Sequence, residues 1–287
     1  MNQELQITCI SLTNNFIVVC NTDQLLFFNR KTNEKLSYEQ KQILVYTFAF
    51  DEETSKIAVD SEDNSILILQ IVNQKIQRIF QSSPAHFNQI RGLVFYEQGK
   101  KLITCSHDEM IFIWDLETFQ VLHQINQLKG KIQHLTLFHN QKFFTTISSE
   151  GYSLFYNLHN RKVFYCTNRI NERAQEICGI KQNLMKNEKV LVLIDNKIKM
   201  ISLNKQKILR VLQFDGEYQE AQFCLNDRAL LLINYIDIKL FDHQTGIILK
   251  TIPLQNQVHC YSLDKENDIL VYGNFYGSNY NKLDLRI

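Results

Sequence analysis

The feature that most constrains the fold is a two-residue motif that recurs along the whole chain. A bulky apolar residue followed by a polar one ends seven β-rich runs, and successive copies are 40 to 45 residues apart. A fixed period of this length indicates a repeat protein, in which one supersecondary unit is stacked many times. The copies are Phe28–Asn29, Leu69–Gln70, Trp114–Asp115, Tyr156–Asn157, Ile201–Ser202, Phe241–Asp242 and Leu283–Asp284.

The copy at residues 86–125 has the clearest internal pattern. Turn residues at 97–99 and 117–118 separate short apolar runs, which alternate with polar residues in places and are continuous elsewhere. This mixture is typical of strands that lie between two neighbouring sheets. The expected strands are residues 90–95, 101–106, 110–115 and 120–125.

Seven copies at this period resemble the WD40 family, whose repeat forms one four-stranded blade of a β-propeller. The resemblance covers essentially the whole chain and is strongest in residues 86–125. There His86, Ser106, Asp108 and Trp114 match the side chains that form a hydrogen-bonded structural relay in that family, although Ala85 replaces its glycine. The resemblance implies an all-β, seven-bladed β-propeller with four-stranded antiparallel blades.

The repeat covers residues 1–287 as a single propeller domain, because no Pro- or Gly-rich linker divides the chain. Closure of the ring has two solutions. Either Glu4–Ile7 pairs into the last blade, or that blade is incomplete, with three strands and an edge that a partner strand could extend. The blades are expected at about residues 7–45, 46–89, 90–131, 132–175, 176–218, 219–257 and 258–287, with residues 1–6 available for closure.

Charge and hydropathy exclude several classes of partner. The net charge is +1, from 31 basic and 30 acidic residues, and no basic stripe is visible, which argues against nucleic acid as a partner. The longest apolar runs, such as residues 229–233, are too short to insert into a membrane. Seven scattered cysteines without paired spacing indicate reduced thiols in an intracellular protein, so we expect a cytoplasmic location.

No pattern in the sequence indicates catalysis. His86, Ser106 and Asp108 could be taken for a nucleophilic triad, but their positions match the structural relay. His134 and His139 are five residues apart on either side of a strand and turn, and surface histidines explain them better than a metal site. We therefore expect no catalytic residues, no metal, no cofactor and no obligate small molecule, and hence no enzyme.

Aromatic residues near the loops are the candidates for binding protein partners. In WD40 proteins one rim carries both the loops that join blades and the second loop within each blade, and it commonly binds peptides. Aromatic side chains are favoured in binding hot spots. The competing interpretation is that these side chains pack against adjacent blades. The candidates are Tyr152, Tyr218, Tyr235, Phe275 and Tyr276.

The function expected from the resemblance is a non-catalytic platform for protein–protein interaction, as a subunit of a larger intracellular assembly. The sequence does not choose among ciliary, cytoskeletal and trafficking assemblies. Partners would use the loop rims or the edge of the last blade. Two alternatives stay open: a reader of a modified peptide tail at an aromatic patch, and an enzyme with its site in the central channel.

Overall fold

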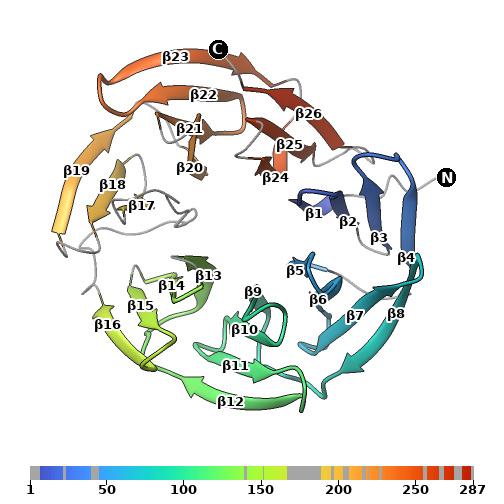
Figure 1. Cartoon of the computed structure of the whole chain (residues 1–287). Helices are drawn as coiled ribbons and strands as arrows, with labels where there is room; N and C mark the ends of the chain where they lie inside the picture. Colours follow the sequence, from blue (N-terminus) through green and yellow to red (C-terminus); the bar gives the residue numbers. More distant parts are fainter. Residues whose placement is uncertain are drawn as a thin grey trace. The chain divides into compact units, whose positions relative to one another are not determined.

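All the regular secondary structure in the described residues is β-strand, arranged in sheets of sequential strands (Figure 1). The structure is a computed structural model. It describes residues 7–21, 24–39, 45–138, 141–150, 152–166, 189–194, 197–202, 207–214, 218, 220–225, 228–254, 257–264, 268–274 and 280–285.

The chain divides into two compact units, and the first contains Met1–Thr104, Ile111–Gln124 and Asn256–Leu285. Four sheets belong mainly to this unit. Their strands are β1 (Ile7–Leu12), β2 (Phe16–Asn21), β3 (Gln24–Asn29) and β4 (Lys35–Glu39); β5 (Phe48–Asp51), β6 (Lys56–Asp60), β7 (Ile66–Val72) and β8 (Lys75–Gln81); β9 (Ile90–Tyr96), β10 (Lys101–Ser106), β11 (Ile111–Asp115) and β12 (Gln120–Ile125); and β24 (Val258–Asp264), β25 (Ile269–Asn274) and β26 (Tyr280–Asp284).

The second unit contains Cys105–Met110, Ile125–Gln255 and Arg286–Ile287, with three sheets. Their strands are β13 (Ile132–Phe138), β14 (Phe143–Ser148), β15 (Ser153–Asn157) and β16 (Lys162–Cys166); β17 (Lys189–Ile194), β18 (Lys197–Ser202) and β19 (Lys207–Gln213); and β20 (Glu220–Cys224), β21 (Ala229–Ile233), β22 (Asp237–Asp242) and β23 (Ile247–Pro253).

The sheets confirm the all-β class and the four-stranded antiparallel blade, but not seven complete blades. Among the described residues five sheets have four strands, and the sheets β17–β19 and β24–β26 have three. The first strand expected near residue 176 and the closing strand at residues 1–6 lie outside the described residues. The structure therefore tests neither solution for closure of the last blade, and the single domain stays a prediction.

Burial changes from strand to strand in the way the repeat requires. The second strand of each four-stranded sheet is buried nearly throughout, as in β21, where all five residues are buried and apolar. The fourth strand is mostly exposed, as in β8 and β23. A sheet covered on both faces needs a continuous apolar strand in its middle, whereas an outer strand can carry polar residues.

The hydrophobic cores lie between neighbouring sheets of one unit. Side chains of β2, β3, β6 and β7 form one core, and side chains of β6, β7, β9, β10 and β11 form the next. In the second unit, Ile198 and Leu212 of one sheet pack with Phe223 and Phe241 of the next. Each sheet therefore depends on a neighbour to bury its apolar faces, as expected for stacked repeats.

The polar residue of the recurring motif has a definite role in the turn that follows it. The side-chain oxygens of Asn29, Asp115, Asn157 and Asp242 each accept hydrogen bonds from the backbone N–H groups two and three residues further on. This Asx turn leads from the third strand into the fourth, which explains the preference for Asn and Asp. These N–H donors also lower the pKa of Asp115 and Asp242.

The bulky residue of the motif lies at an irregularity of the sheet. The pairing of the third and fourth strands shifts register next to Leu69, Tyr156, Ile201 and Phe241. A β-bulge recurring at one place in successive repeats is a structural feature of the repeat rather than a defect. The two halves of the motif thus specify a bulge and the turn after it.

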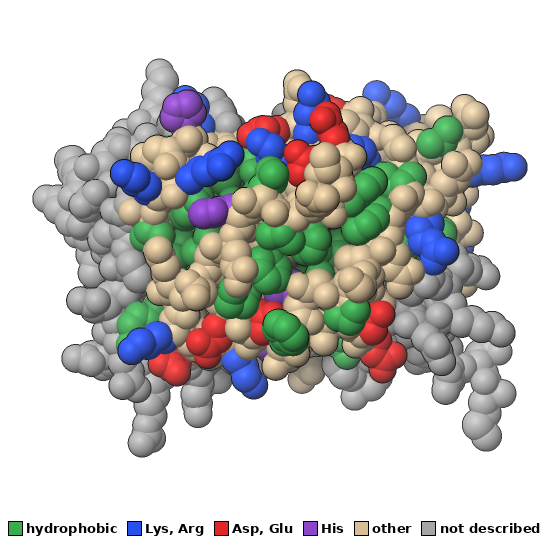
Figure 2. Space-filling view, turned by 90° about the horizontal axis from the view of Figure 1, so that it is seen from below, with side chains coloured by type: hydrophobic (Ala, Val, Ile, Leu, Met, Phe, Trp, Pro, Cys, Tyr) green, Lys and Arg blue, Asp and Glu red, His purple; other side chains and the backbone are tan. Residues whose placement is uncertain are grey.

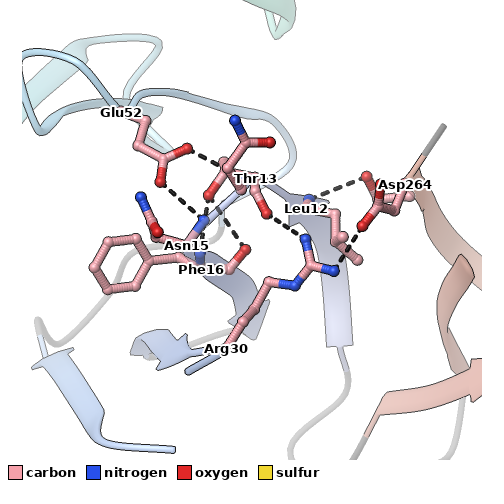
Figure 3. Close-up of polar contacts among 9 residues, drawn as sticks. Leu12, Thr13, Asn15, Phe16, Arg30, Glu52 and Asp264 are labelled. Carbon is pink, nitrogen blue, oxygen red and sulfur yellow. Dashed lines mark hydrogen bonds and ion pairs between the residues drawn. The ribbon is translucent and has the colours of Figure 1, made fainter. Parts of the chain in front are cut away.

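The first and last sheets of the chain pack against each other within the first unit, and β1 lies beside β24 (Figure 1). Arg30 forms an ion pair of 2.6 Å with Asp264, and its guanidinium also donates to the carbonyl of Thr13 at 2.7 Å (Figure 3). On the other side, the carboxylate of Glu52 accepts the backbone N–H of Asn15 at 2.9 Å (Figure 3). Polar contacts at the β1–β2 turn therefore join three sheets, one of them from the far end of the chain.

Candidate protein-interaction surface

The loop from Ser82 to Gln89, which joins β8 to β9, is held tightly to its neighbours. The backbone N–H groups of Ala85 and His86 donate to the carbonyl of Asn64 at 2.9 and 3.3 Å. The imidazole of His86 is buried and stacks on Phe112, with ring centroids 4.6 Å apart. A loop fixed at both backbone and side chain can present neighbouring residues in a defined position.

The sequence placed His86, Ser106, Asp108 and Trp114 in one relay, and the structure adds a residue that this prediction missed. The hydroxyl of Thr104 lies 2.8 Å from Nε2 of His86 and accepts the indole N–H of Trp114 at 3.1 Å. The hydroxyl that joins the histidine to the tryptophan is therefore that of Thr104.

Ser106 and Asp108 form the turn between β10 and β11. The Ser106 hydroxyl accepts the backbone N–H of Asp108 at 3.1 Å, and the Asp108 carboxylate accepts that of Met110 at 3.0 Å. Thr104 and Ser106 are two residues apart in one strand and both are fully buried, so the sequence pattern cannot tell them apart. A link from Ser106 or Asp108 to His86 stays a prediction.

An open groove with a volume of about 440 Å³ lies beside this network. Its aromatic lining comes from Phe80, Phe112, Trp114 and Phe119, and the rings of Phe80 and Phe119 stack at 4.2 Å. The remaining lining residues are Gln81 and Ser82–Ala85 of the loop, together with Val121 and Gln124 of β12. None of these lining residues is charged. The groove therefore suits an apolar group with neutral hydrogen-bonding partners around it.

Exposed apolar side chains lie on the same strands and loop. Ile79 of β8 and Val121 and Leu122 of β12 are each about two-fifths exposed, and Phe87 at the loop is 97% exposed. Figure 2 views the face over β8, β11 and β12 and shows hydrophobic side chains across its middle, with charged ones mostly above and below. Exposed large apolar side chains of this kind are typical of protein-interaction sites.

Between them, the two outer strands that line the groove carry basic side chains and no acidic one, whereas Asp115 and Glu117 lie at the turn between β11 and β12. Strand β8 carries Lys75 and Arg78 and no acidic residue, and β12 carries no acidic residue either. The Arg78 guanidinium donates to the side-chain oxygen of the lining residue Gln81 at 3.0 Å. Within the part of the chain that the structure describes, neither Lys75 nor Arg78 forms an ion pair with a carboxylate.

The strands that line the groove lie within the segment that matches a known family model. Residues 48–140 match the family model described as "Anaphase-promoting complex subunit 4 WD40 domain". This match and the relatives below support a WD40-repeat family for the chain. A segment of 116 residues is 22% identical to "WD repeat-containing protein 55 homolog" of Drosophila simulans, and equally to that of Drosophila melanogaster. The aligned segment is 40% of this chain and 22% of each of those proteins, so the match spans about a fifth of their length.

The aromatic residues that were predicted to bind partners differ in their exposure to solvent. Tyr218 is buried, its ring packs against Phe214 at 5.7 Å, and its hydroxyl accepts a hydrogen bond from Lys239 at 3.1 Å. That contact raises the pKa of Lys239. Tyr152 is partly buried in the turn between β14 and β15. Packing against neighbouring elements is therefore the better account of Tyr218.

Tyr235 is 49% exposed, in the turn between β21 and β22, beside Ile236, which is 74% exposed. Phe275 and Tyr276 lie outside the described residues, so the patch predicted from them with Tyr235 is not tested. The surface around Phe87 and the aromatic groove was missed. The sequence does contain a signal for it, because five large aromatic residues gather in residues 80–119, which overlap the strongest copy of the repeat. They are Phe80, Phe87, Phe112, Trp114 and Phe119.

A buried carboxyl group fixes the connection between the sheets β1–β4 and β5–β8. Asp60, at the end of β6, accepts the backbone N–H groups of Tyr46 and Thr47, both at 2.9 Å. Burial raises the pKa of Asp60 to about 7, against the opposing effect of these hydrogen bonds and of Arg91. The Asp60 carboxyl therefore holds the backbone that leads into β5, and its charge changes near neutral pH.

In the described ranges, no three His, Cys, Asp or Glu side chains are grouped so that they could hold a metal ion. The same ranges contain no helix long and apolar enough to cross a membrane.

Proposed function

We propose that this chain is a seven-bladed WD40 propeller that acts as a non-catalytic interaction scaffold in a larger cytoplasmic assembly. WD40 propellers typically serve as such scaffolds and imply protein partners. The matching family model describes a domain of a complex subunit, which supports membership of an assembly. Ciliary, cytoskeletal and trafficking assemblies all suit this role.

The observation that carries the proposal is the apolar surface on β8, β12 and the Ser82–Gln89 loop. Exposing Phe87 almost fully on an anchored loop, next to an aromatic groove, favours burial against another protein. A freely soluble monomer would gain nothing from this arrangement, since exposed apolar area promotes unspecific association.

The test is the size of the native particle that contains the chain. We expect the tagged protein, expressed at its natural level in its own cells, to elute from a sizing column far above its mass of 33.9 kDa, together with stoichiometric protein partners. Elution as a monomer in a gently prepared extract would contradict a scaffold function. A Phe87→Ser/Val121→Ser protein shows whether the apolar surface is needed for the assembly.

A further inference from the structure

We propose that the aromatic groove between β8 and β12 binds an extended segment of a protein partner that combines a large apolar residue with acidic ones. This inference rests on the proposed scaffold function and assigns it a site and a kind of ligand. The residues that carry it are Phe80, Trp114, Phe119 and Arg78.

The backbone of Phe119 fixes one wall of the groove. Its φ is 57°, in the left-handed region that bulky residues rarely adopt. Phe119 lies five residues after the bulky residue of its motif. The residues at this place in four other copies also have positive φ, so the turn imposes this conformation: Asn33, Gln74, Arg161 and Gly246. The copy that faces the groove uses an unfavourable residue and places its ring on Phe80 at 4.2 Å. The turn therefore fixes the place of the Phe119 ring in the wall of the groove.

The charges select the partner. The lining is neutral, whereas Arg78 on the adjoining strand β8 is positively charged, and no described carboxylate forms an ion pair with it. Arg78 contacts the groove through Gln81. A carboxylate on the ligand would complete this arrangement, whereas a basic segment would be repelled.

The position of the groove favours an extended ligand. Strand β12 is at the end of the strand order β12-β11-β10-β9. Among the described strands it pairs with β11 and with no other. Val121 and Gln124 of this strand line the groove, so a peptide lying in the groove runs beside an open strand edge. Such a peptide can satisfy its own backbone there while its apolar side chain enters the groove.

The experiment uses the whole chain and its single tryptophan. A phage-displayed library of random dodecapeptides is selected on the purified protein, and the enriched peptides are synthesised and titrated while Trp114 fluorescence is recorded. We expect acidic peptides with at least one aromatic or large aliphatic residue, which change the Trp114 emission because this indole lines the groove.

Two matched variants locate the site. Phe119→Gly removes the aromatic wall and relieves the strained turn, so its melting temperature should stay within about 5 °C of the original, while peptide binding weakens about tenfold or more. Arg161→Gly makes the same backbone change in another copy and should leave binding unchanged. Arg78→Glu should weaken the acidic peptides and leave the fold intact, because Arg78 is exposed.

Three results would overturn the proposal: no enrichment above background, enrichment of basic peptides, or peptides that bind Phe119→Gly as tightly as the original chain. A concentration-dependent dimer that disappears in Phe119→Gly would also overturn it, by assigning the groove to a second copy. The scaffold function is judged separately. A large native particle that persists in the Phe119→Gly protein would sustain the scaffold and reject the groove as its contact, whereas a monomeric native protein would reject the scaffold.

Discussion

The sheets β9–β12 and β20–β23 come from the same repeat, yet they hold their incoming loops by different chemistry. In the first, Trp114 and the loop residue His86 share the hydroxyl of Thr104. In the second, the motif residue is Phe241, and the incoming loop contributes Phe214, whose ring meets that of Phe241 at 4.9 Å. Trp114 and Phe241 are each 8% exposed.

Each of these two sheets has a contact that fixes the incoming loop to the sheet, which we call a pin. The chemistry of the pin differs between the two sheets. Hydrogen bonds to a buried hydroxyl are directional, and aromatic packing is not, but either can fix the loop. A sequence motif defined by the hydrogen-bonding residues of β9–β12 is therefore not recognisable in β20–β23, although the structure of the sheet is the same. The predictions below test this equivalence.

The largest effect is expected from removing the motif side chain itself. Trp114→Ala and Phe241→Ala should each lower the free energy of unfolding by about 3–5 kcal/mol, because a large aromatic leaves a cavity. Denaturant unfolding followed by circular dichroism measures both, with exposed Val121→Ala as the control. A loss below about 1 kcal/mol in only one of the two sheets would show that the pins are not equivalent.

The buried carboxyl of Asp60 adds a pH dependence that an apolar residue at this place cannot have; Ile233 ends the corresponding strand β21. Its folded pKa of about 7 lies above the ordinary value of 3.8, so the folded state binds the extra proton between these values. Stability should therefore fall by roughly 1 kcal/mol per unit as the pH rises from about 4 to 7, and level off above.

Asp60→Asn keeps an acceptor for Tyr46 and Thr47 and removes the charge. We expect this variant to lose the slope and to match or exceed the original chain in melting temperature at pH 8. Equal slopes for the two proteins between pH 4 and 7 would assign the pH dependence to other groups.

A change confined to the polar pin should have an intermediate effect. Thr104→Val leaves the buried indole N–H of Trp114 and the ring of His86 without their shared partner, at a cost of about 2 kcal/mol. Thr104→Ser retains the hydroxyl and should cost less. If the two variants were equally stable, packing alone would hold this loop too.

The smallest effect is expected from the polar atom beside the apolar pin. Tyr218→Phe removes the acceptor for Lys239 but keeps the ring that packs on Phe214, so the loss should stay below about 1 kcal/mol. The pKa of Lys239 should fall towards its ordinary value, which a titration followed by NMR would show. A loss as large as that of Thr104→Val would mean that this pin is polar as well.

The sequence predicted the strands of residues 86–125 to within one residue, because turn residues separate them and their apolar pattern is strong. It did not predict that Thr104, rather than Ser106, joins His86 to Trp114, since both hydroxyls point to the same side of β10. It selected Tyr218 as a binding residue, and that residue is buried. Exposure of single aromatics is decided by the neighbouring sheet, which a local pattern does not contain.

The sequence by itself determined the repeat, its period and the local structure at each motif, because a bulge and an Asx turn depend on residues that are close along the chain. Only the tertiary structure decided which faces are covered and which stay open. It brought Asp264 to Arg30 and placed Phe80 beside Phe119, so that a groove formed where two hairpins meet. Such juxtapositions depend on packing between sheets, which is non-directional and leaves no periodic trace in the sequence.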